Sequence, residues 1–288
     1  RNKSYVNIGG VAMGIAGSYC DAEMFRKYFG IRPEWVDMTE VLRRITLEIY
    51  DHDEYEKAIA WVKENCKEGI DFNEGKDLPE MIKRSKVVPA DKDWEFIVKM
   101  TMVVRDILYG NKKLDEMGWH EEALGKNAIA GGFQGQRNWT DWLPNGDFTE
   151  SIMASTFDWN GTKPPTPFAT ENDTLNGVSM MLGTLVSGTA PCFHDVRTYW
   201  SADAYERISG KRPQGKASEG FIHLINSGAT ALDCTGASKN ENGENCMKPF
   251  YEMTDADIKA CTDATDWRRA NYEYFRGGGF SSHFRTGA

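Results

Sequence analysis

Short apolar segments alternate along this chain with longer segments in which apolar residues recur every three or four positions. The run Tyr5–Ile8 precedes a helical pattern over Asp21–Tyr28, and the run Asn127–Phe133 precedes another over Glu150–Phe157. The three- to four-residue spacing predicts amphipathic helices, and the short apolar runs predict buried strands. Strands that alternate with helices form mostly parallel sheets covered by helices on both faces. The sequence therefore predicts an α/β fold.

The same alternation continues through the first two thirds of the chain and blurs after about residue 187. We therefore predict an α/β domain over residues 1–186 and part of a second α/β or mixed domain over residues 187–288, since domains usually span about 100–200 residues. The remaining predicted helices cover Thr39–Tyr50, Asp53–Cys66, Asp93–Tyr109, Thr174–Val186 and Thr254–Cys261, and the remaining predicted strands cover Glu34–Met38, Phe168–Thr170, Ala190–Val196 and Phe221–Ile225.

The charge of the chain excludes several classes of partner. Its formal net charge is −9, which repels nucleic acids and acidic membrane surfaces. The longest uncharged run, Thr174–Phe193, contains three glycines and several hydroxyl groups, so it is too polar and broken to span a membrane. No signal peptide pattern opens the chain, so we expect a soluble protein whose six cysteines are reduced thiols.

A glycine-rich stretch, Gly9–Gly17, follows the first predicted strand. Its glycines do not fit the G-x-G-x-x-G pattern, so tight packing of strand against helix is favoured over a dinucleotide site. A non-catalytic module that binds a sugar or a nucleotide nevertheless stays open as an alternative function.

Two carboxylates follow predicted strands. Glu171 comes directly after the strand that ends at Thr170, and Asp195 lies near the end of the strand Ala190–Val196. One helix separates them, so the two strands are expected to be neighbours and the carboxylates to converge at the carboxyl edge of the sheet, where ligands bind in α/β folds. A carboxylate after a strand is more often a helix cap than a metal ligand, and Asp173 is expected to cap the next helix.

Other polar side chains fall on the same predicted edge. Gln134 follows the strand Asn127–Phe133, and Asn226 and Ser227 follow the strand Phe221–Ile225. Several strand ends that present polar groups to one edge favour a polyol or sugar site, although they do not identify a reaction. His194 precedes Asp195 and is expected to point to the opposite face of its strand.

At these residues the sequence closely resembles the L-fucose isomerase family, and the resemblance covers nearly the whole chain. The segments that carry it are Gly132–Arg137 (GFQGQR), Ser155–Gly161 (STFDWNG), Ala169–Gly177 (ATENDTLNG), Asp195–Trp200 (DVRTYW), His223–Gly228 (HLINSG) and Glu273–Gly279 (EYFRGGG).

The resemblance implies an isomerase that interconverts L-fucose and L-fuculose and also D-arabinose and D-ribulose. It implies an α/β protein with a Rossmann-like middle domain, cytoplasmic and assembled as a homohexamer, that uses Mn²⁺, with Mg²⁺ as the alternative ion. The metal-binding and catalytic carboxylates of the family match Glu171 and Asp195, and its sugar-contacting residues match Gln134, Ser227 and Tyr274. L-arabinose isomerase remains a less well-matched alternative.

The resemblance also implies that this chain is an incomplete piece of such an enzyme. The family's third metal ligand is a histidine beyond Ala288, and an N-terminal domain precedes the part that matches Arg1. Residues 187–288 would then be an incomplete C-terminal domain, and residues 1–288 alone are expected to be inactive.

The chemistry of aldose–ketose isomerisation agrees with this set of residues. A proton moves between C2 and C1, and negative charge develops on two adjacent oxygens of an ene-diolate. A divalent cation held by oxygen ligands stabilises that charge, and a carboxylate beside it acts as general base. Oxygen ligands favour Mn²⁺ or Mg²⁺ over softer metals.

Overall fold

A four-stranded parallel sheet lies at the centre of the computed structural model, which describes residues 2–11, 16–226 and 229–285. The strands are ordered β2–β1–β3–β6, and each neighbouring pair is parallel. The predicted α/β class with a parallel sheet is thus confirmed. The four strands are β1 (Ser4–Ile8), β2 (Arg32–Val36), β3 (Ala128–Phe133) and β6 (Phe168–Thr170).

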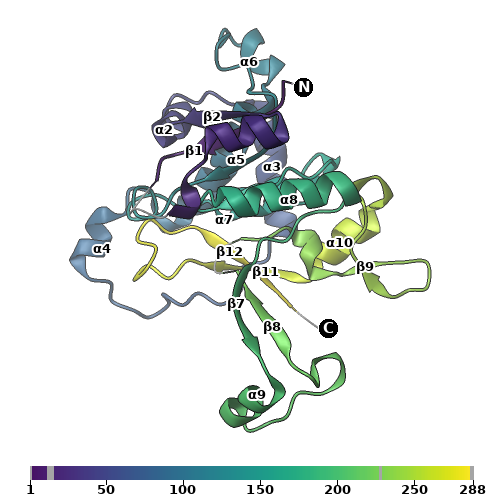
Figure 1. Cartoon of the computed structure of the whole chain (residues 1–288). Helices are drawn as coiled ribbons and strands as arrows, with labels where there is room; N and C mark the ends of the chain where they lie inside the picture. The colour runs from purple at the N-terminus through teal and green to yellow at the C-terminus, as the bar shows by residue number, and fades with distance from the viewer. Residues whose placement is uncertain (1, 12–15, 227–228, 286–288) are drawn as a thin grey trace.

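Helices cover both faces of this sheet, because its strands carry apolar side chains on both sides. Tyr5 packs with residues of α8 (Thr174–Ser187), which crosses the front of the sheet in Figure 1. Val6 and Ile8 point the other way, into the larger core that includes α5 (Asp93–Tyr109) and α7 (Asp147–Ala154). Alternate residues of a strand face opposite sides, which explains this division.

The regular structure in the connection from β2 to β3 consists of helices joined by loops. It includes α5, whose buried face was predicted from its apolar spacing. The shorter helices of the first half are α1 (Ala22–Met24), a π-helical turn (Phe25–Phe29), α2 (Met38–Thr46), α3 (His52–Asn65), α4 (Glu80–Ser85) and α6 (Lys112–Glu116).

The last third of the described chain has only small antiparallel sheets. The ribbon of β7 and β8, with α9 at its tip, projects away from the central sheet (Figure 1). The domain boundary near residue 187 stays a prediction. The elements outside the central sheet are β4 (Phe157–Asp158), β5 (Gly161–Thr162), β7 (Asp195–Trp200), α9 (Ala202–Ser209), β8 (Phe221–Ile225), β9 (Ser238–Lys239), β10 (Asn245–Cys246), α10 (Asp255–Asp263), β11 (Thr265–Arg269) and β12 (Phe280–Phe284).

The strand predicted over Ala190–Val196 is wrong in its position. The strand begins only at Asp195, and it pairs with β8 in the antiparallel ribbon rather than with the central sheet. Pro191 has no backbone N–H to donate to a ladder, and Phe193 is buried in a small apolar cluster instead. Asp195 therefore starts a strand outside the central sheet. Contrary to the prediction, the strand that precedes Glu171 and the strand that contains Asp195 are not neighbours.

The expectation that all cysteines are reduced also differs from the structure. Cys192 and Cys234 form a disulfide, with their Cα atoms 6.2 Å apart. They are separated by 42 positions in the sequence, and nothing in that spacing indicates a pair. The bond attaches the segment that leads into Asp195 to a 3₁₀ turn, Leu232–Thr235.

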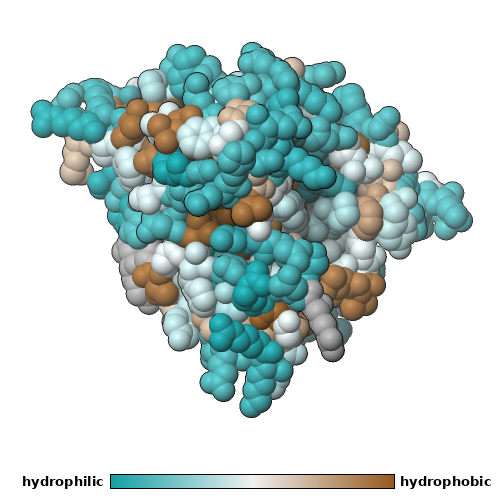
Figure 2. Space-filling view, turned by 90° about the horizontal axis from the view of Figure 1, so that it is seen from above, coloured by the Kyte–Doolittle hydropathy of each residue, from teal (hydrophilic) through white to brown (hydrophobic). Residues whose placement is uncertain are grey.

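The surface agrees with the charged composition. Figure 2 shows a face on which hydrophilic residues cover most of the area and hydrophobic residues form separate small patches. Within the described ranges, no helix combines the length and the apolar character that a membrane crossing requires.

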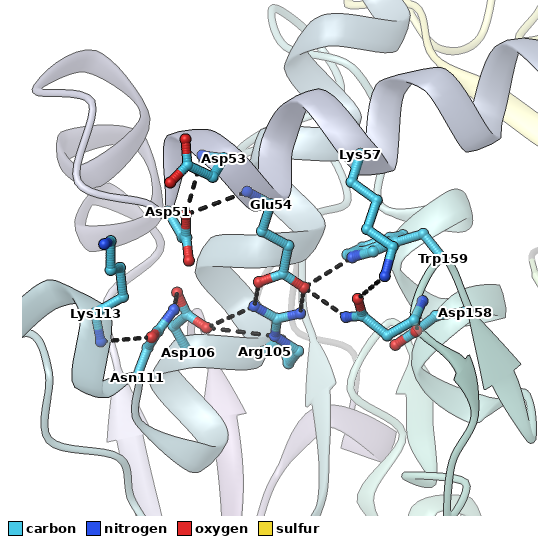
Figure 3. Close-up of polar contacts among 11 residues, drawn as sticks. Asp51, Asp53, Glu54, Lys57, Arg105, Asp106, Asn111, Lys113, Asp158 and Trp159 are labelled. Carbon is cyan, nitrogen blue, oxygen red and sulfur yellow. Dashed lines mark hydrogen bonds and ion pairs between the residues drawn. The ribbon is translucent and has the colours of Figure 1, made fainter.

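A partly buried ion pair joins α3 to α5 (Figure 3). Arg105 binds both carboxylate oxygens of Glu54, with Nη2 2.7 Å from Oε2. Trp159 Nε1 and Asn160 Nδ2 donate to Glu54 Oε1 over 2.8 and 2.7 Å. Burial alone raises the pKa of Glu54, but the hydrogen bonds and charge of Arg105 outweigh it and lower the pKa to about 2. The network thus connects both helices to the β4–β5 turn.

Replacing Arg105 with methionine should destabilise the protein, because Glu54 would stay partly buried without its cation. Breaking a fully buried pair in this way costs about 3–5 kcal/mol and an exposed pair at most about 1 kcal/mol, so a loss between these values is expected. Urea unfolding at pH 7 measures the loss. Lys259→Met is the matched control, since it removes an exposed pair with Asp263 whose loss costs at most about 1 kcal/mol. Equal losses in the two variants would contradict the role of the Glu54–Arg105 pair.

The same pair predicts a pH dependence. The pKa of Glu54 is lowered on folding from its ordinary value of 4.5 to about 2, so its contribution to stability is fully present above pH 4.5. It is lost as the pH falls from 4.5 towards 2. The difference in unfolding free energy between the unmodified protein and Arg105→Met should therefore shrink over that window, and a constant difference would contradict the assignment.

Candidate active site

The carboxyl edge of the central sheet collects polar side chains from several strands. The chain leaves β1 for β2 on one side and later returns to β3 on the other, so a topological switch point lies between β1 and β3. Ligands of open α/β sheets bind at such a point. The backbone N–H of Gln134, which follows β3, donates to the carbonyl of Ile8 at the end of β1 over 2.8 Å.

Glu171 and Asn172, directly after β6, adopt left-handed backbone conformations. Their φ angles are +55° and +51°, which only a small percentage of non-glycine residues adopt. The Glu171 carbonyl accepts hydrogen bonds from Ser18 Oγ and Gln134 Nε2, each over 2.8 Å. Asn172 is buried, and its Nδ2 donates to Asn7 Oδ1 over 3.0 Å. These contacts hold the unusual turn in place.

The Glu171 carboxyl group is partly exposed and receives a hydrogen bond from Gln136 Nε2 at Oε1. Burial raises the pKa of Glu171, and the negative charge of Asp195 raises it further. Asp195 binds Arg197, with Nη2 3.2 Å from Oδ2. The Asp195 carboxylate therefore lies close enough for its charge to act on Glu171.

Glu171 and Asp195 line one cavity of about 220 Å³. The antiparallel register pairs Asp195 with Ile225, which brings Asn226 at the end of β8 to the same place. The predicted convergence of the two carboxylates is thus found, although through an antiparallel ribbon and not through neighbouring parallel strands. The cavity is lined by Gly17, Ser18, Thr170, Glu171, Asp173, Phe193, Asp195, Arg197 and Asn226.

Asp173 also borders this cavity, and it caps α8 as predicted. Its side chain accepts from the backbone N–H of Asn176 over 3.5 Å. Burial raises the pKa of Asp173, and the charge of Asp195 adds to the effect. Its carboxyl group is thus engaged in the helix cap, whereas Glu171 faces the cavity with a side chain oriented by Gln136.

The donor set of this cavity is compatible with a hard divalent cation. Glu171 and Asp195 supply carboxylate oxygens, which Mn²⁺ and Mg²⁺ prefer. Across residues 2–11, 16–226 and 229–285, no group of three or more His, Cys, Asp or Glu side chains is arranged to hold a metal. Glu171 and Asp195 would supply two of the oxygen ligands that such a cation needs.

The three predicted sugar contacts lie in different surroundings. Gln134 is fully buried, and its amide donates to Ser18 and Glu171 while its Oε1 accepts from the Gln136 backbone over 3.1 Å. Tyr274 is 71% exposed in the segment between β11 and β12. Ser227 lies outside the described residues. No bound sugar tests these three roles, so they stay predictions.

Sequence reasoning missed two buried carboxyl groups on α7. Glu150 is 5% exposed and accepts from Thr170 Oγ1 over 2.9 Å, and Asp147 accepts from Ser281 Oγ. Burial raises the pKa of Glu150 well above its ordinary value, and the charge of Asp147 raises it further. Burial likewise raises the pKa of Asp147 to about 6. Their three-residue spacing on a helix was the available signal, since it places both on one face.

Comparison with known proteins places the chain in a family. A model of the domain described as "L-fucose isomerase, second N-terminal domain" matches residues 3–188. Curated proteins named L-fucose isomerase from Clostridium perfringens and Phocaeicola vulgatus are 66% and 58% identical over 100% and 99% of this chain. Another, from Vibrio vulnificus, is 54% identical over 99% of the chain.

The match covers 48%, 48% and 47% of those three relatives, so the chain spans about half the length of the curated proteins it matches. The extent of the domain match and the level of identity nevertheless leave one assignment: this chain belongs to the L-fucose isomerase family.

Proposed function

We propose that the full-length protein interconverts L-fucose and L-fuculose, with Glu171 and Asp195 at the reacting centre. The main support for this proposal is that the two carboxylates line one cavity, where Gln136 orients Glu171. It agrees with the name L-fucose isomerase that the relatives bear. D-arabinose and D-ribulose form a second substrate pair. The assay that tests the proposal compares turnover of L-fucose with turnover of L-arabinose, and faster turnover of L-arabinose would contradict it.

Mn²⁺ is the proposed cofactor, with Mg²⁺ as the alternative, and Glu171 and Asp195 would hold it. When bound, the cation supplies positive charge beside the two sugar oxygens that become negative during isomerisation. Such ions prefer octahedral sets of oxygen ligands. Two carboxylates supply only part of that set, so we expect residues 1–288 alone to be inactive.

Glu171 is the proposed general base that removes the proton from C2 of the aldose and returns one to C1. The hydrogen bond from Gln136 to Oε1 restricts rotation of the carboxyl group. The left-handed turn fixes the backbone from which the side chain extends. Asp195 enters the same cavity from β7, and Gln134, Ser227 and Tyr274 are the proposed sugar contacts. A cytoplasmic homohexamer is the proposed assembly.

Removal of divalent cations should abolish the activity of the full-length protein. Treatment with a chelator is expected to stop formation of L-fuculose, and addition of Mn²⁺ is expected to restore it. The reason is that negative charge on two adjacent oxygens needs a strong electrophile in the transition state. Full activity after exhaustive chelation would refute the proposed cofactor.

Conservative substitution of the two carboxylates should remove most activity. Glu171→Gln and Asp195→Asn keep the side-chain size but remove the negative charge, and loss of a general base alone costs about 10²–10⁴-fold in rate. Asp173→Asn is the matched control in the same cavity, because asparagine caps a helix about as well as aspartate. If Asp173→Asn were the most damaging of the three in kcat, the assignment of Glu171 and Asp195 would be wrong.

Gln134 can be tested against Ser18, because both donate to the same carbonyl of Glu171. Gln134→Ala and Ser18→Ala should each lower the unfolding free energy by about 1–3 kcal/mol, since a buried hydrogen bond is lost. If Gln134 also contacts the sugar, its variant alone raises the KM for L-fucose. Equal KM values in both variants would leave Gln134 with a structural role only.

A further inference from the structure

A second cavity, of about 100 Å³, also reaches Glu171 and is lined by residues of β6 and α7. The polar residues that line it are Gln136, Thr140, Asn145, Asp147, Glu150, Thr170 and Glu171. Phe133 and Phe275 contribute apolar wall. Glu171 thus lines both this cavity and the one that it shares with Asp195.

Asn145 is one of the residues that line this second cavity, and its side-chain amide is buried and unpaired. Its residue is 2% exposed, and neither Oδ1 nor Nδ2 has a hydrogen-bond partner among the described residues. Its backbone N–H donates to the carbonyl of Gly278 over 3.0 Å, which fixes the position of the residue. Leaving a buried polar atom unpaired costs about 1–3 kcal/mol. Such a group therefore calls for a polar ligand in the cavity.

Water fits both the size and the chemistry of this cavity. About 10–15 Å³ is enough to hold one water molecule, and the cavity is several times larger. The wall offers amide, hydroxyl and carboxyl groups, which provide the two to four partners that a buried water needs.

Glu150 acts on Glu171 through the preceding residue. Its Oε2 accepts from Thr170 Oγ1 over 2.9 Å, and Thr170 is the last residue of β6. Glu171 then turns into its left-handed conformation, which costs about 1–2 kcal/mol for a residue with a side chain. A strained turn keeps its geometry only where its surroundings hold it. Glu150 supplies one such restraint from the α7 side.

We propose that this cavity is a built site for ordered water, and that Asn145 and Glu150 are positioning residues which hold Glu171 through that water and through Thr170. The effect on catalysis rests on the proposed function, whereas the water site does not. Replacing a residue that holds a metal ligand in its orientation commonly lowers metal affinity or activity about 10–100-fold.

The first test is a crystal structure of the full-length protein at a resolution that defines ordered water. Water within hydrogen-bond distance of Asn145 Oδ1 or Nδ2 is the expected result. A dry cavity, a side chain that fills it or a metal ion bound there would overturn the water site. This outcome is independent of which sugar the protein isomerises, so it separates the inference from the proposed function.

The second test measures kcat and KM for L-fucose in three variants. Asn145→Leu and Glu150→Leu keep a similar size but remove the polar groups, and each should lower kcat about 10–100-fold with a smaller change in KM. Glu150→Gln keeps an oxygen that accepts from Thr170, so it should recover kcat to within a few-fold of the unmodified protein.

Val104→Ala is the matched control for lost stability, because Val104 is fully buried in α5 and does not line the cavity. It should lower the melting temperature without lowering kcat. If Asn145→Leu and Glu150→Leu behave like Val104→Ala, the two residues are merely structural and the inference is wrong. It is also wrong if Glu150→Gln is as inactive as Glu150→Leu.

Discussion

The hydrogen bonds to the Glu171 carbonyl are the interaction on which the arrangement of the site depends. Ser18 comes from the segment after β1, Gln134 from the end of β3, and Glu171 from the end of β6. One carbonyl oxygen therefore ties together three segments that are distant in the sequence. The left-handed turn of Glu171 and Asn172 accompanies the contact of that oxygen with Ser18 and Gln134, while Glu171 lines the cavity. A polar sheet edge becomes a defined site only because this turn is fixed.

Periodicity predicted the central sheet well, because its strands and helices bury continuous apolar faces. The strand ending at Thr170 and the Asp173 cap both follow from local rules, and they place Glu171 correctly. Asp195 was expected near the end of a parallel strand, and the structure puts it at the start of an antiparallel one. The sequence around Asp195 is compatible with either kind of strand, and the pairing with β8 determines which one forms. Pro191 was the local signal against the earlier start.

The buried side of the site could not be predicted from local pattern. Carboxyl groups are rarely buried, so Asp147 and Glu150 suggest a solvated helix end rather than a wall behind Glu171. Glu150 is buried because α7 is covered along its length, with every residue from Phe148 to Ala154 buried, and Asp147 at the start of the helix is partly buried. Asn145 gave no signal at all, since an Asn–Gly pair before a helix favours an exposed turn. Long-range packing against the Gly277–Gly279 segment determines its position.

The placement of Asp195 relative to Glu171 rests on the base of the β7–β8 ribbon. A two-stranded ribbon is only marginally stable by itself, and this one exposes Val196 and Ile222. Its base is held instead by the Cys192–Cys234 disulfide and by buried hydrogen bonds next to it. Asp233 Oδ2 accepts from the backbone N–H of Thr156 over 3.0 Å, just beyond the end of α7. Helix α7 contacts Thr170, next to Glu171, through Glu150, and the segment directly after α7 contacts Asp233 at the base of the ribbon. The positions of both carboxylates therefore depend on the same part of the core.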